Sequence, residues 1–211
     1  MKVLEHPYKL KFQQTEKLII KFSGENRIRK YLKALQNHSP QTLEHSFRVA
    51  LLCVDLGFEN KLEEREMHLL GYAGLLHDIG KVQIPSEILN KNSILTSFER
   101  GLINNHTRSG SQTIQGFGDD LKRIIVGHHE YQKDSYPRKK ERRTVRREKK
   151  DRRENNPLIE SLTEILAVSD LYDALRSERA YKSSKDRTET RKIMLSQYTG
   201  DTKYIDQLLT R

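Results

Sequence analysis

Cysteine is nearly absent from the sequence, because Cys53 is its single thiol. One cysteine cannot form an internal disulfide, and such a chain is typical of a reducing compartment. Long apolar runs are also missing, since none approaches the roughly 20 residues that a membrane span needs. The opening residues, MKVLEHPYKLKF, hold no apolar segment of the kind found in secretory signals. We therefore expect a cytoplasmic protein without a membrane span, in which Cys53 is a small buried apolar residue.

Apolar residues make up 35% of the 211 residues and charged residues 32%. This length suffices for one domain with a core of its own, provided that the apolar residues form stripes on the secondary structure. We expect a short helical extension over residues 1–38 and one main domain over residues 39–211.

The net charge of +10 is concentrated in one basic insertion of the main domain. Residues 138–153, RKKERRTVRREKKDRR, hold eleven Lys or Arg and three Asp or Glu, a net charge of +8, which leaves +2 for the other 195 residues (211 − 16). Runs of this kind are usually solvated. Contact with nucleic acid or another polyanion is the alternative, although the run offers no aromatic residue for base stacking.

Helix signals dominate, and neither strand alternation nor a hairpin signal is present. Residues 1–38 fit one or two short helices, and five longer helices are expected after them. The first begins at Ser39–Pro40 and ends at Gly57, and the second runs from Leu62 to Asp78 with Gly80 as the stop. The third starts at the capping box TSFE (96–99) and runs toward His106. The fourth starts at Asp119 and runs toward His128–His129, and the fifth starts at Pro157. The sequence predicts an all-α, bundle-like fold.

Several polar side chains continue apolar stripes of these helices and therefore face the interior. They are His45, His106, His128, His129 and Asp170, and the pair His77–Asp78 ends another apolar run. A single histidine on an apolar face is usually a hydrogen-bonded core residue. A buried, ionised carboxylate without a partner is very costly, however, so it must be protonated, paired or bound to metal. Five histidines and two acids together indicate a metal site between the helices of a bundle.

Two of these pairs, His77–Asp78 and His128–His129, are adjacent in the sequence. Neighbouring residues of a helix point roughly 100° apart. This arrangement suits two metal ions about 3.5 to 4 Å apart better than one ion, and the two oxygens of Asp78 suit a bridge between them. Mixed imidazole and carboxylate ligands favour iron or manganese, with zinc and nickel left open.

The same residues stand in stretches that resemble the HD superfamily of metal-dependent phosphohydrolases, and more narrowly its HD-GYP family. The similarity covers about residues 39–182 and includes LLHDIGKVQIPSEILNKNSILT, NHTRSG, IIVGHHE and ILAVSDLYDALRSERAYK. An isolated HD dipeptide has no diagnostic value, whereas agreement in order, spacing and flanking residues is specific. The resemblance implies an enzyme that hydrolyses a 3′-5′ phosphodiester of a cyclic dinucleotide, most often cyclic di-GMP.

The resemblance also implies roles for particular residues. One metal ion would be held by His45, His77, Asp78 and Asp170, and the second by Asp78, His106, His128 and His129. Three basic residues, Lys81, Arg179 and Lys182, match the family's positions that contact substrate phosphates. The residues implied in catalysis itself are Asp78 and Lys81. Two divalent ions suit this reaction because they activate water near neutral pH and stabilise charge on a phosphoryl group.

The sequence departs from the family pattern at two places. Some members hold a third metal ion through a glutamate one helical turn before the first histidine, where this chain has Gln41, a weak ligand. We therefore expect two metal ions. The loop that usually reads DGxGYP keeps Tyr136 and Pro137, but it is shorter and has Ser135 in place of the glycine. Serine resists the backbone angles and close ligand approach that glycine allows, so the alteration falls on the loop that faces the substrate and not on the metal ligands.

Three other functions stay open beside the cyclic dinucleotide phosphodiesterase. The altered loop is compatible with an HD phosphohydrolase that acts on another nucleotide. It is also compatible with a catalytically weak, nucleotide-binding regulatory module. The fourth hypothesis is polyanion binding through residues 138–153. The sequence indicates neither the oligomeric state nor a regulatory partner.

Overall fold

The computed structural model describes residues 6–136, 156–177 and 186–211. Within these ranges every regular element is a helix and no strand is formed, so the predicted all-α class is confirmed. The basic insertion 138–153, Pro137, Arg179 and Lys182 lie outside the described residues. In the part of the chain that is described, no helix has the length and apolar character needed to cross a membrane.

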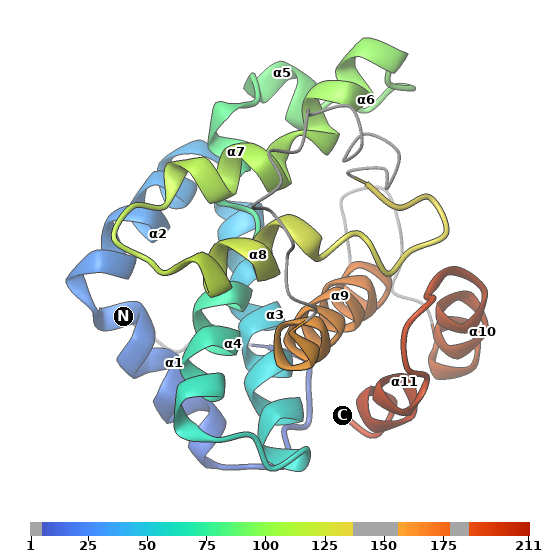
Figure 1. The fold of residues 1–211 in the computed structure, drawn as a ribbon. Coiled ribbons are helices and arrows are strands. Elements are labelled where there is room, and N and C mark those ends of the chain that lie inside the picture. The colour runs from blue at the N-terminus through green and yellow to red at the C-terminus, as the bar shows by residue number, and fades with distance from the viewer. Residues whose placement is uncertain (1–5, 137–155, 178–185) are drawn as a thin grey trace, which may run out of the picture.

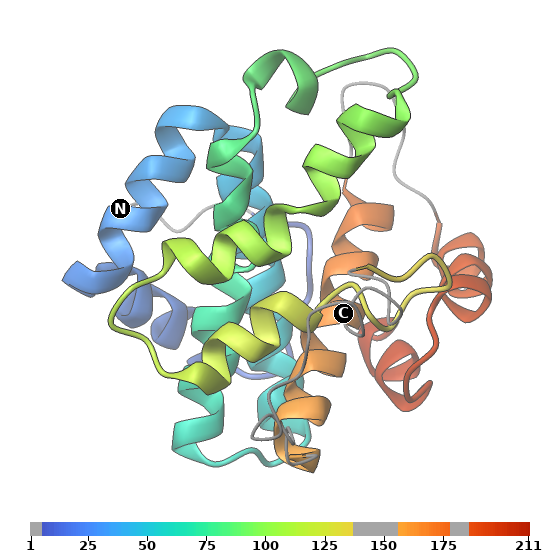
Figure 2. The ribbon, with the colours of Figure 1, turned by 45° about the horizontal axis from the view of Figure 1, so that its top comes forward.

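Three helices, α3 (Pro40–Glu59), α4 (Glu64–Leu76) and α9 (Pro157–Arg176), lie at the centre of the molecule (Figure 1). On one side are α1 (Gln14–Gly24) and α2 (Asn26–His38), and on the other are α10 (Arg187–Gln197) and α11 (Lys203–Leu208). The 3₁₀ helix η1 (Ile79–Gln83) follows α4. The remaining helices are α5 (Ser86–Leu89), α6 (Ser97–Asn104), α7 (His106–Thr113) and α8 (Asp119–Gly127). In Figure 2, α7 and α8 lie side by side, and each contacts the other.

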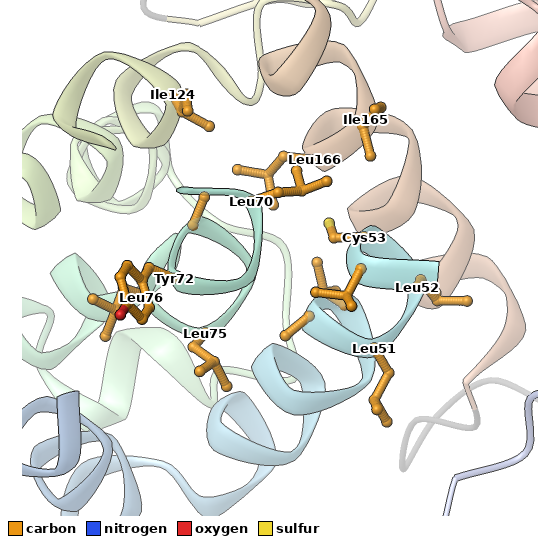
Figure 3. Packing of buried hydrophobic residues seen from close by; sticks show 14 of the residues in the cluster. Leu51, Leu52, Cys53, Leu70, Tyr72, Leu75, Leu76, Ile124, Ile165 and Leu166 are labelled. Carbon is orange, nitrogen blue, oxygen red and sulfur yellow. The ribbon is translucent and has the colours of Figure 1, made fainter. Parts of the chain in front are cut away.

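The core is built around α3, which packs against both α4 and α9. Figure 3 shows Cys53 of α3 near Leu70 of α4 and Leu166 of α9. All three side chains are fully buried. Burial raises the pKa of the Cys53 thiol to about 12, so the thiol stays neutral, in agreement with the expected role as a small apolar residue. Packing of these buried side chains fixes α3, α4 and α9 relative to one another, and these helices carry much of the candidate site.

The predicted start of α3 is confirmed, but its predicted end is wrong. Ser39 is the N-cap, and its Oγ accepts a hydrogen bond from the Thr42 amide at 3.3 Å. The helix continues through Gly57 to Glu59. A Cβ at position 57 would lie 2.5 Å from the sulfur of Met67 in α4. Glycine therefore permits the close approach of α3 and α4 there and does not end the helix.

The predicted role of Gly80 is also wrong. Helix α4 ends at Leu76, and Gly80 lies inside η1 and not at a left-handed helix stop. A Cβ at position 80 would collide with the carbonyl oxygen of His106 and would lie 2.6 Å from the amide nitrogen of Gly110. The glycine is needed because α7 packs directly on η1, and this contact places His106 beside the His77–Asp78 pair.

The helix predicted to run toward His106 is divided in two. Its capping box is confirmed, since Thr96 Oγ1 accepts from the Glu99 amide and Glu99 accepts from the Thr96 amide. Helix α6 ends at Asn104, however, and His106 begins α7. The expectation that His106 continues the apolar stripe of this helix is therefore wrong, because the helix ends before His106 and Phe98, which lies on that side of it two turns earlier, is 74% exposed. At the next helix, Asp119 is the first residue of α8 and not its cap.

Candidate metal centre

Seven side chains from five helices, or from the ends of those helices, meet in one place. They are His45 of α3, His77 and Asp78 at the end of α4, His106 at the start of α7, His128 and His129 at the end of α8, and Asp170 of α9. Three overlapping groups have ligand atoms within 4.8 Å of one another, namely His106–His128–His129, His45–His77–Asp78 and His77–His128–Asp170. Separations of this size are what a bound cation requires of its ligands.

Asp78 lies between the histidines and uses both of its oxygens. Its Oδ2 lies 3.5 Å from Nε2 of His77 and 3.8 Å from Nε2 of His45. Its Oδ1 lies 3.3 Å from Nε2 of His106. The ammonium of Lys81 is 2.5 Å from Oδ2. One carboxylate thus faces histidines on both sides, which is the geometry expected of a bridging ligand.

Three of the imidazoles are oriented by helix ends. The Nδ1–H groups of His77, His106 and His128 each donate to the carbonyl three residues earlier, at 2.9, 2.7 and 2.6 Å. Each of these carbonyls belongs to the last turn of a helix (α4, α6 and α8), where carbonyls lack a partner within the helix. Because a carbonyl can only accept, the proton must be on Nδ1. The lone pair on Nε2 is then available in the centre.

The Nε2 atoms of these rings fit a bound cation. Those of His106 and His128 lie 3.4 Å apart, and with both Nδ1 atoms protonated neither ring has a proton to place between them. Nε2 of His77 is buried without a hydrogen-bond partner among the described residues. Facing lone pairs and an unsatisfied buried nitrogen are costly without a proton or a cation between them. The donor set therefore fits divalent metal ions.

His45 is held differently from the other histidines. Its Nε2 lies 3.0 Å from Oδ1 of Asp170, and its Nδ1 donates to Oδ2 of Asp173 at 2.6 Å. Burial disfavours the charged ring, yet the hydrogen bonds to Asp170 and Asp173 outweigh it and raise the pKa of His45 to about 9. Sequence reasoning missed Asp173. A second acid three residues after Asp170, one turn along the same helix, was the available signal.

Burial and neighbouring charges set the protonation of the other groups. Burial lowers the pKa of His106 to about 3 and that of His129 to about 4. Burial opposes ionisation of Asp78, but Lys81 and the histidines hold the pKa of its carboxyl well below the usual range. Apart from His45, whose pKa is raised, the centre thus combines neutral imidazoles with ionised carboxylates, the forms in which both groups bind metal.

A cavity of about 670 Å³ opens beside the centre. His45, Asp78 and Lys81 line it from the metal side, and Gln41 and Glu44 line it from the first turns of α3. Residues 89–92 also line it, and its volume lies within the range of small-molecule and cofactor pockets. Gln41 and Glu44 belong to none of the three ligand groups found among the described residues.

Tyr136, which belongs to the altered loop, also contacts the centre. Its ring stacks on His129 at 4.3 Å between centroids, with 27° between the ring planes. It lies 6.1 Å from the ring of His106. The loop that carries Ser135 thus reaches the His106–His129 side of the centre, so its sequence bears on what can enter there.

Comparison with known proteins identifies the family. Residues 31–207 match the family model described as HD domain. The chain is 31% identical to the 3′3′-cGAMP-specific phosphodiesterase 1 of Vibrio cholerae over 72% of its own length, and 31% identical to a cyclic di-GMP phosphodiesterase of Pseudomonas aeruginosa over 75%. It spans only about a third of these relatives, 33% and 36% of their lengths.

One solved structure supports the fold. The HD domain of the L. monocytogenes phosphodiesterase PgpH, crystallised with cyclic-di-AMP, aligns with a TM-score of 0.57. The alignment covers 85% of this chain and 92% of that one, with 18% identity. Together with the match to the family model, this result places the all-α fold described above among HD domains. The chain belongs to the HD-domain family, as its sequence motifs predicted.

Proposed function

We propose that the chain is a dinuclear metal phosphodiesterase that hydrolyses a 3′-5′ phosphodiester of a cyclic dinucleotide, with cyclic di-GMP as the first candidate. The observation that carries this proposal is the meeting of five histidines and two aspartates beside a cavity of about 670 Å³. The curated names of relatives, which are cyclic di-GMP and 3′3′-cGAMP phosphodiesterases, support the substrate class.

Two ions of iron or manganese would occupy the centre. One set of ligands would be His45, His77, Asp78 and Asp170, and the other Asp78, His106, His128 and His129. When bound, such ions lower the pKa of water and stabilise negative charge on phosphoryl oxygens. The chain's contribution is to keep His106 and His129 neutral, to keep Asp78 ionised between the two sets, and to fix the rings of His77, His106 and His128 through helix-end carbonyls.

Lys81 would act directly on the substrate. Its ammonium lines the cavity and lies beside Asp78, so a phosphate that enters the cavity next to the centre meets a positive charge there. That charge would stabilise the additional negative charge that develops as the phosphodiester breaks. Arg179 and Lys182 are proposed to contact phosphates as well, on the resemblance alone.

Product analysis on metal-loaded protein tests the proposal. Protein purified without oxygen and supplied with Fe²⁺ or Mn²⁺ should convert cyclic di-GMP to a linear dinucleotide or to GMP. A Lys81→Met variant should bind the same metal and lose most of the rate. Metal-loaded protein that leaves cyclic di-GMP, cyclic di-AMP and 3′3′-cGAMP untouched would reject the proposal.

A second candidate, favoured by Ser135 in the altered loop, is an HD phosphohydrolase acting on another nucleotide. A panel of nucleotides and phosphate esters, compared by kcat/KM, separates the two. A regulatory module would instead bind a cyclic dinucleotide tightly without turnover, even with both metals supplied.

Two further expectations are proposals of the same kind. A cytoplasmic location is favoured by the single cysteine, as argued from the sequence. Polyanion contact through residues 138–153 would give a steeply salt-dependent association with RNA or DNA, and deletion of that run should abolish it. Association that persists unchanged in the deletion variant would assign those residues to a solvated linker.

A further inference from the structure

Asp173 joins three distant parts of the chain behind the metal centre. Its buried carboxylate accepts from the Tyr8 hydroxyl at 2.6 Å and from Nδ1 of His45 at 2.6 Å. The guanidinium of Arg48 adds two more hydrogen bonds, from Nε at 2.8 Å and from Nη2 at 3.1 Å. Each oxygen of Asp173 therefore accepts two hydrogen bonds, and the carboxylate cannot turn without breaking several of them.

This saturation fixes the ring of His45. With Nδ1 held by Asp173, the other nitrogen, Nε2, is directed toward Asp170 and Asp78, at 3.0 and 3.8 Å. A carboxylate behind a ligating histidine sets its tautomer and orientation and raises its basicity. The position of Asp173 thus determines how well His45 can serve as a ligand.

Tyr8 is placed by a separate set of contacts. It belongs to the N-terminal strap, which we define as residues 6–13. The strap is anchored where the amides of Lys11 and Phe12 each donate to Oδ1 of Asp55 at 3.0 Å. The Tyr8 ring lies 5.6 Å from that of Tyr172, and the residue is only 7% exposed. The strap therefore delivers one buried hydroxyl to the carboxylate behind His45.

We propose that Tyr8 is a positioning residue that acts through Asp173 on His45, so that the seating of the N-terminal strap sets the metal affinity of the His45 side of the centre. The inference deepens the proposed function, on which it rests for the presence of metal. It gives the strap a role in the centre although Tyr8 touches neither metal ligand atoms nor the cavity.

A pair of matched variants of the full chain tests the inference. Tyr8→Phe removes the hydroxyl and keeps the packed ring. Tyr31→Phe is the control, because Tyr31 is also 7% exposed and its hydroxyl bonds to Gln115 and Thr113, away from the centre. Calorimetric titration of metal-free protein with Mn²⁺ should show one site weakened about 2- to 10-fold in Tyr8→Phe, the loss expected for one hydrogen bond. Tyr31→Phe should match the wild type.

The route through Asp173 is tested by a double variant. Asp173→Asn should weaken the same site about 10- to 100-fold, as substitutions behind a metal ligand do. Adding Tyr8→Phe to it should cause no further loss, because the hydroxyl then has no carboxylate to position. The visible spectrum of the Co²⁺-loaded protein should change in Tyr8→Phe and not in Tyr31→Phe. If Asp173→Asn does not fold, the Tyr8 and Tyr31 pair decides alone.

The outcomes separate this inference from the proposed function. Wild-type protein that binds no metal would overturn both. Wild-type protein that binds metal and hydrolyses its substrate, while Tyr8→Phe titrates like Tyr31→Phe, would overturn only the inference. Effects of Tyr8→Phe and Asp173→Asn that multiply would also overturn it, because the two residues would then act independently.

Discussion

Single residues fix the metal centre through backbone groups that helices leave free. His77, His106 and His128 each take the carbonyl three residues earlier, in the last turn of a helix. These carbonyls need a donor in any case, so orienting the rings costs no additional buried polar group. Gly80 also helps to place His106, because its missing side chain leaves room for the His106 carbonyl.

The first prediction concerns Gly80. Gly80→Ala should destabilise the metal-free protein by about 1–3 kcal/mol, the cost of overpacking a closely fitted contact, because α7 must move away from η1. Urea denaturation measures this loss. Gly101→Ala is the matched control, since a Cβ there meets nothing within 4 Å, and it should leave stability unchanged or slightly raised. Equal stability of Gly80→Ala and the wild type would contradict the close packing described here.

The second prediction concerns pH. Burial lowers the pKa of His106 to about 3 and that of His129 to about 4, from 6.5. The unfolded chain therefore binds more protons than the folded one below pH 6.5, and stability falls as pH decreases. For the metal-free protein we expect a loss of up to about 1.4 kcal/mol per pH unit for each histidine between pH 6.5 and 4.

Thermal unfolding of the metal-free protein between pH 7.5 and 4 measures this loss. The carboxyl groups of Asp78 and Asp170, whose pKa values are lowered below 3.8, stay ionised in the folded protein across that window, and they add to the loss only near pH 4, where the same groups begin to be protonated in the unfolded chain. A variant with His106→Gln and His129→Gln should show a shallower dependence. The same slope in both proteins would mean that these imidazoles are not buried in the neutral form.

At the scale of elements, the helices differ strongly in how deeply they are buried, and α3 and the pair α5 and α6 stand at the two extremes. Almost every residue of α3 from Thr42 to Gly57 is buried, whereas α5 and α6 have no buried residue. The segment between them carries the large exposed side chain of Ile94, at 91%. Since residues 89–92 line the cavity, this sparsely packed part of the described chain borders the place proposed for substrate.

The third prediction follows from this contrast. Amide hydrogen exchange should be fast across residues 86–104 and slow across α3 and α9, because few buried contacts oppose local opening of α5 and α6. Mass spectrometry of exchanged peptides measures both in one experiment. Protection of α6 equal to that of α3 would show that α6 is packed more firmly than its exposure indicates.

The helices predicted best from the sequence are those whose ends carry chemical signals. The predicted starts of α3 at Ser39–Pro40 and of α9 at Pro157 are correct, and in the structure a side-chain oxygen, from Ser39 and from Asn156, caps the first turn of each helix. The helix ends predicted at Gly57 and Gly80 are wrong, because both glycines permit close packing between helices that the sequence alone does not place side by side. A glycine that permits close approach and one that ends a helix look alike in a sequence.

At the scale of the whole molecule, the fold brings together groups far apart in the chain. The seven predicted ligand residues do lie together in the structure. They could be predicted because each is recognisable within its own segment, by its apolar neighbours and its motif. The group behind His45 could not be recognised in this way. Tyr8 and Asp173 are 165 positions apart, and a tyrosine in an N-terminal segment has no local pattern that points to a metal ligand.

The measurement that tests the account most directly is metal content beside turnover, on protein purified without oxygen, for the wild type, Asp78→Ala and Asp206→Ala. Asp206 is the control, because it is an exposed acid of α11 that pairs with Arg191 and belongs to none of the ligand groups found in the described part of the chain. The account predicts two bound Fe or Mn ions per chain and hydrolysis of a cyclic dinucleotide in the wild type and in Asp206→Ala. Folded Asp78→Ala should have lost both. Asp78→Ala that keeps its metal and its rate, or wild-type protein that binds no metal, would contradict the account.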